Sequence, residues 1–159
     1  MGPSAGHVFQ ERRDRKQHAR KISDDLRSRI ESQCDGVLAG VNGLMTRLGL
    51  AEVTYPFTAE AIESIDRQTR ADIVKGHDAH NSLSTEDKAA HLARLYSSID
   101  WAVTMHTNMI RANHEREAQG LPIRHPQEEI EAEKAKALKG RERIQKAIFA
   151  LKKEFRQGM

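Results

Sequence analysis

One apolar stripe constrains this chain more than any other feature of its sequence. Its members recur at steps of three and four residues: Ile22, Leu26, Ile30, Cys34, Val37, Val41, Leu44 and Leu48. This spacing places all of them on one face of an α-helix. The stripe therefore predicts a long amphipathic helix over residues 10–48, with Gly49 as its C-terminal cap. Residues 10–21 carry almost no apolar side chain, and we expect them to form a solvated extension.

Shorter stripes predict further helices over residues 58–75, 85–119 and 126–157. Thr58 is expected to cap the first of these, and Pro126 suits the first position of the last. Residues 77–83 are expected to form a loop, and Ser84 to begin the helix that follows it. Ser97 and Ser98 could interrupt that helix, but the apolar period continues through them, which favours one unbroken element.

About four helices with short connections predict an all-α fold, an elongated antiparallel helical bundle with up-down-up-down topology. Only 4% of the residues are aromatic and 31% are charged, which suits long helices with narrow apolar faces. We expect one domain over residues 9–159, preceded by a flexible leader at 1–8. The helix over 58–75 is too short to cover the others, so an apolar groove should remain beside it. Such a groove favours a homo-oligomer or a larger complex.

Cys34 is the only cysteine, which rules out an intramolecular disulfide framework and a thiolate metal cage. No apolar run approaches the roughly 20 residues of a membrane span, so we expect a cytoplasmic protein without membrane contact. The sequence contains no glycine-rich phosphate loop, no His-Glu-x-x-His and no nucleophile signature. These features predict a protein that is not an enzyme and needs no cofactor.

The charges are unevenly distributed, although the net charge is only +3. Residues 1–49 carry a net +3, residues 50–119 a net −4, and residues 120–159 a net +4. In the predicted topology, the start of the first helix and the end of the last lie at the same end of the bundle. Cations from both would form a basic pole that contacts nucleic acid through its phosphates, or an acidic protein. These cations are Arg12, Arg13, Arg15, Lys16, Arg20, Lys21, Lys146, Lys152, Lys153 and Arg156.

Three glycines lie on one face of the first predicted helix, namely Gly36, Gly40 and Gly43. Each glycine costs about 1 kcal/mol relative to alanine inside a helix. Three together indicate a close approach of another backbone, either the helix over 85–119 or a second protomer.

Several histidines are candidate metal ligands or core residues. His77, His80 and His91 are weak candidates for a metal site, because His-x-x-His in a predicted loop has low specificity. His106 lies on the apolar stripe of its helix, which favours a buried histidine that is hydrogen-bonded to a neighbouring helix.

The sequence therefore supports three functional hypotheses. The first is a helical assembly module, a small basic accessory subunit of a nucleoprotein complex. The second is a regulator or chaperone-like protein that sequesters a partner in the apolar groove. The third is a metal-binding helical protein.

Overall fold

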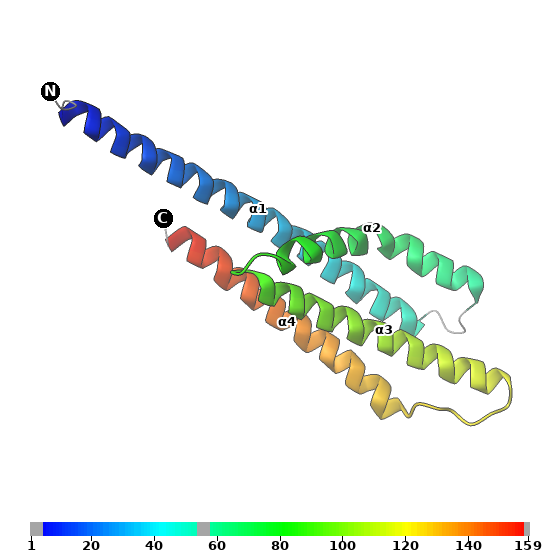
Figure 1. The fold of residues 1–159 in the computed structure, drawn as a ribbon. Coiled ribbons are helices and arrows are strands. Elements are labelled where there is room, and N and C mark those ends of the chain that lie inside the picture. Colours follow the sequence, from blue (N-terminus) through cyan, green and yellow to red (C-terminus); the bar gives the residue numbers. More distant parts are fainter. Residues whose placement is uncertain (1–4, 54–57, 158–159) are drawn as a thin grey trace.

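The computed structural model describes residues 5–53 and 58–157, with side chains from residue 10 onward except at 19, 22, 23, 53 and 59. These residues form the helices α1 (Ala5–Val53), α2 (Ala59–Ser84), α3 (Ala90–Ala118) and α4 (Gln127–Gln157), with no strand among the described residues. The helices alternate in direction and pack as an elongated bundle (Figure 1). The all-α class and the bundle are thus confirmed.

The bundle consists of two tight helix pairs. α1 packs mainly against α2 and α3 mainly against α4, while contacts of α1 and α2 with α3 join the pairs. Buried side chains from all four helices form the core. None of the helices, within the described ranges, has the length and apolarity needed to cross a bilayer.

α1 extends further in both directions than its stripe predicted. It begins at Ala5, so residues 5–8 are helical although they were assigned to a leader, and residues 1–4 lie outside the described residues. It also continues through Gly49 to Val53, which makes the prediction of a cap at Gly49 wrong. The reason is that Ala51 is buried and adds another contact to the stripe after Leu48.

α2 is longer than expected, which corrects the prediction of a short helix and of a loop at residues 77–83. It starts as predicted, with the Thr58 hydroxyl accepting a hydrogen bond from the Ala61 N–H at 3.1 Å. It then continues to Ser84 because Ala79 and Leu83 are buried against the core. The groove that was expected beside a short helix therefore loses its structural basis.

The connection between α2 and α3 is a compact turn. The Glu86 N–H donates to the Leu83 carbonyl at 3.1 Å, and the Ala89 N–H to the Glu86 carbonyl at 2.9 Å. α3 consequently begins at Ala90, and Ser84 ends α2 instead of capping α3. α3 is continuous through Ser97 and Ser98, as the apolar period indicated.

Gly120 and the side chain of Asn113 fix the connection between α3 and α4. Gly120 has a φ of +71°, and the Leu121 N–H donates to the Arg116 carbonyl at 2.9 Å. This arrangement is a Schellman ending, which favours glycine at the left-handed position. The Asn113 side chain accepts from the N–H groups of Arg124 and His125 and donates to the His125 carbonyl. The segment is thereby tied back to α3.

The three glycines of α1 face α2, and at Gly40 the Tyr96 side chain of α3 also approaches. A Cβ on Gly40 would lie 2.5 Å from the Gly76 Cα and 2.8 Å from the Tyr96 hydroxyl oxygen. Cβ atoms on Gly36 and Gly43 would meet Ala79 and Ile73 of α2 at 2.9 and 3.0 Å. The close approach anticipated from the sequence therefore lies within the chain, where the backbones of α1 and α2 nearly touch.

Candidate nucleic-acid interface

The first part of α1 projects beyond the rest of the bundle (Figure 1). We call residues 10–25 the arm. Every arm side chain that the structure describes is exposed, and Ile30 is the first buried residue of α1 among those whose side chains are described. At about 1.5 Å per residue, α1 extends roughly 35 Å ahead of Ile30. The arm is therefore a helix whose described side chains remain open to solvent.

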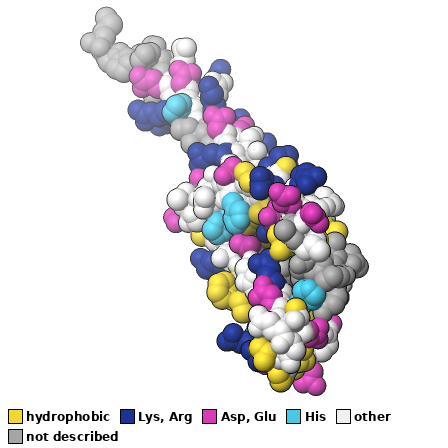
Figure 2. Space-filling view, turned by 90° about the vertical axis from the view of Figure 1, so that its right-hand side faces the viewer, with side chains coloured by type: hydrophobic (Ala, Val, Ile, Leu, Met, Phe, Trp, Pro, Cys, Tyr) yellow, Lys and Arg dark blue, Asp and Glu magenta, His cyan; other side chains and the backbone are white. Residues whose placement is uncertain are grey.

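Helical geometry separates the charges of the arm. Arg12, Lys16 and Arg20 follow one another at steps of four residues, which places them on one face. Most of the acidic side chains lie on the other side at helical spacing, at Glu11, Asp14 and Asp25. Figure 2 shows both kinds of side chain along the arm. The acidic residues thus leave one face of the arm predominantly basic.

This basic face points in the same direction as the core face of α1. Arg12 precedes Ile30 by 18 residues, which is five full helical turns. Ile30 faces the other helices of the bundle because it is buried among them. Arg12 and Lys16 therefore lie on the same side of α1 as its core face, which is the side toward the other helices.

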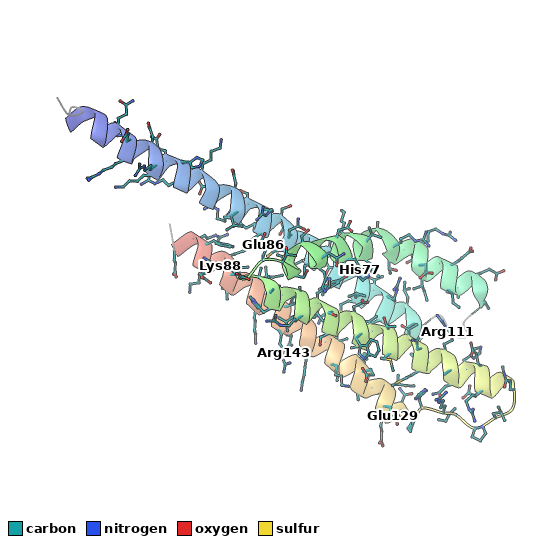
Figure 3. All side chains as sticks on the ribbon, viewed as in Figure 1. His77, Glu86, Lys88, Arg111, Glu129 and Arg143 are labelled. Carbon is teal, nitrogen blue, oxygen red and sulfur yellow. The ribbon has the colours of Figure 1, made fainter. Side chains whose placement is uncertain are left out.

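Two ion pairs mark the end of the bundle along α1. Lys152 of α4 pairs with Asp35 at 3.1 Å, and Arg29 pairs with Glu86 of the α2–α3 turn at 2.6 Å. Figure 3 shows Glu86 and Lys88 at the end of the bundle from which the arm projects. α4 ends at Gln157, five residues past Lys152, so within the described ranges only the arm continues beyond that level.

The predicted basic residues thus lie at one end of the molecule but do not form a single cap. Five of them form what we call the basic step, namely Arg12, Lys16 and Arg20 of the arm with Lys153 and Arg156 near the end of α4. All five are exposed. Arg15 and Lys21 lie on other sides of the arm, Arg13 lies next to the basic face, and Lys146 lies further back along α4. Lys152 is partly neutralised by Asp35.

The histidine candidates for a metal site do not converge. His77 and His80 lie on α2 with their rings 5.9 and 5.7 Å from the ring of Tyr96, whereas His91 is exposed on α3. Among the described residues, no group of three His, Cys, Asp or Glu side chains is placed to hold a metal ion. Cys34 is buried, which raises the pKa of its thiol to about 11 and keeps it protonated at neutral pH.

His106 is buried at the meeting point of α1, α3 and α4. Its Nε2 lies 3.3 Å from Glu52 Oε1, and Lys134 Nζ lies 2.9 Å from the same oxygen. A cleft of about 410 Å³ opens beside them, with Glu131 also in its lining. Burial lowers the pKa of His106, against the opposing influence of Glu52, so the imidazole is neutral at pH 7. This cluster ties three helices together.

The pH dependence of stability tests this assignment. Because the folded-state pKa of His106 is below its usual value of 6.5, the unfolded chain binds a proton more readily below that pH. Stability should therefore fall as the pH drops from about 7 to about 5, and His106→Gln should reduce that fall. Thermal unfolding at both pH values measures the effect. His91→Gln is the matched control, because His91 is exposed on the same helix. Equal pH dependence in both variants would contradict the assignment.

Two exposed aromatic residues were not anticipated from the sequence. Trp101 on α3 is 67% exposed and Phe149 on α4 is 70% exposed. Phe149 lies directly after Ile148, and it is Ile148 that is buried in the core. The helical period of the sequence indicates which positions face outward. An aromatic residue at such a position is the only further sequence signal of an exposed ring.

No protein-family model matches the chain, and no match was found among curated proteins or among solved structures.

Proposed function

We propose that this chain is a non-enzymatic nucleic-acid-binding module, a small accessory subunit of a nucleoprotein complex. One observation carries the proposal. The basic face of the arm lies on the core side of α1, at the end of the bundle where Lys153 and Arg156 of α4 are exposed. A phosphate backbone bound along the basic step would contact cations from both α1 and α4.

The chemistry favours sequence-independent contact. Lys and Arg side chains on an exposed helix bind phosphate oxygens, and this contact provides affinity and position without reading bases. The arm offers Arg12, Lys16 and Arg20 at steps of about 6 Å along its axis. Because its described side chains are exposed, the arm can meet a ligand without displacing any part of the bundle.

A salt series tests the proposal. We expect the full chain to bind a fluorescent 20-nucleotide oligonucleotide, with an affinity that falls steeply as salt rises. Engagement of the five cations of the basic step predicts a slope of roughly −3 to −5 in log affinity against log salt. Fluorescence anisotropy measures both quantities. Absence of binding at low salt, or an affinity independent of salt, would refute the proposal.

A further inference from the structure

Trp101 lies in a groove between α3 and α4, away from the basic step. The groove has a volume of about 400 Å³, and its lining includes Leu95, Ser98, Trp101, Lys136, Lys139 and Arg143. The helices approach closely here, since a Cβ on Gly140 would lie 2.6 Å from Ile99 Cγ1. Trp101 thus lies where α3 packs closely against α4, and two thirds of the residue is exposed.

Cations follow the groove and continue along α4. Lys136, Lys139, Arg143, Lys146 and Lys153 recur at helical spacing on the outer side of α4, and all are exposed. Arg143 lies at the lower edge of the bundle in Figure 3. Lys136 pairs with Glu133 at 3.0 Å, and Glu142 lies beside Arg143, so the stripe is not purely basic. It nevertheless leads from the groove to the basic step.

Phe149 places a second exposed ring beside this stripe. It lies three residues after Lys146 and four before Lys153, so all three share one side of α4. Phe149 follows Arg143 by six residues, which places it a third of a turn further round α4, so the cations lead from the Trp101 groove round α4 to the second ring.

We infer that the surface from Trp101 round α4 to Phe149 binds single-stranded nucleic acid, with bases stacking on the two rings and phosphates contacting the cations of α4. The inference rests on the proposed function and names its substrate class. Aromatic side chains stack on bases that are free of a partner strand, whereas duplex bases are already stacked within the helix. The basic step alone would not distinguish the two forms.

An anionic membrane is the other surface that attracts aromatic and basic side chains. Membrane-binding helices present a continuous apolar face. Here the rings are separated by Arg143 and Lys146, and Phe149 lies nine residues, or about 13 Å, beyond Gly140 along α4. Alternation of rings and cations matches the alternation of bases and phosphates, so nucleic acid is favoured.

The chain offers a direct probe, because Trp101 is its only tryptophan. We expect a single-stranded 20-mer of thymidylate to quench the intrinsic fluorescence of the full chain, and a 20-base-pair duplex to quench it much less. Trp101→Ala should weaken single-strand binding by roughly 5- to 100-fold, as expected from about 1–3 kcal/mol per stacked base. Trp101→Phe should retain part of that affinity, and Phe149→Ala should show a smaller loss.

Matched controls separate stacking from other effects. Val74→Ala removes an exposed apolar side chain from α2 and should leave single-strand affinity unchanged. Trp101→Ala should leave duplex affinity unchanged, and thermal unfolding should show an intact fold because the indole is mostly exposed.

The outcomes discriminate between the two proposals. If both oligonucleotides bind but Trp101→Ala has no effect and no quenching occurs, stacking is overturned while the proposed function stands. If neither binds, both are overturned. Vesicles of phosphatidylserine that shift the tryptophan emission, without any quenching by the 20-mer, would replace the nucleic acid by a membrane.

Discussion

Gly40→Ala is expected to destabilise the fold by about 2 kcal/mol or more, which lowers the Tm by roughly 5 °C for a chain of this length. The added Cβ would lie 2.5 Å from the Gly76 Cα, and a backbone atom cannot avoid it by changing rotamer. It would also lie 2.8 Å from the Tyr96 hydroxyl oxygen. The gain of about 1 kcal/mol in helix propensity does not offset this overlap.

Gly49→Ala is the matched control for that substitution. Gly49 lies in the same helix, but nothing is found within 4 Å of its added Cβ. We expect it to stabilise the chain by up to about 1 kcal/mol, through helix propensity alone. Thermal and denaturant unfolding of both variants measures the difference. A Gly40→Ala variant as stable as the native chain would contradict the close packing of α1 on α2.

The sequence predicted the fold class because apolar periodicity determines which faces of the helices must be buried. It failed at the end of α2, where the predicted helix stops at residue 75, directly before Gly76, whereas α2 continues to Ser84. Glycine usually ends helices. Here it is retained inside one because Gly40 of α1 and Tyr96 of α3 occupy the space that a side chain would need. A tertiary contact of this kind leaves no local signal.

The basic residues of the candidate interface could be named from the sequence, but their arrangement could not. In the linear sequence the arm contains both acidic and basic residues, and Asp14 and Asp25 reduce the net positive charge that its arginines provide. Once the arm is helical, these carboxylates lie on a different side from Arg12 and Lys16. The distance by which the arm projects depends on where α4 and the α2–α3 turn end, and only packing determines that.

The exposed rings were also beyond sequence analysis. An aromatic residue near an apolar stripe is interpreted as core because burial of large apolar side chains is the common outcome. Phe149 follows directly after the buried Ile148. Neighbouring positions differ by about 100° around the helix axis, so the rotation of α4 about its axis decides which of the two side chains faces solvent.

The largest functional effect is expected from the basic face of the arm. The triple variant Arg12→Gln, Lys16→Gln and Arg20→Gln should bind a 20-mer on the order of 100-fold more weakly, at about 1 kcal/mol per lost phosphate contact. Stability should not change, because these side chains are exposed. Arg67→Gln, Arg70→Gln and Arg124→Gln remove the same charge from exposed positions away from the basic step and should bind almost as well as the native chain.

The salt dependence of these two triple variants, measured side by side with the native chain, tests the role of the arm most directly. We predict that the arm variant loses roughly two to three from the magnitude of its slope, whereas the control variant keeps the native slope. Equal slopes for both variants would show that the cations contribute only to net charge, and would contradict a phosphate-binding role for the arm.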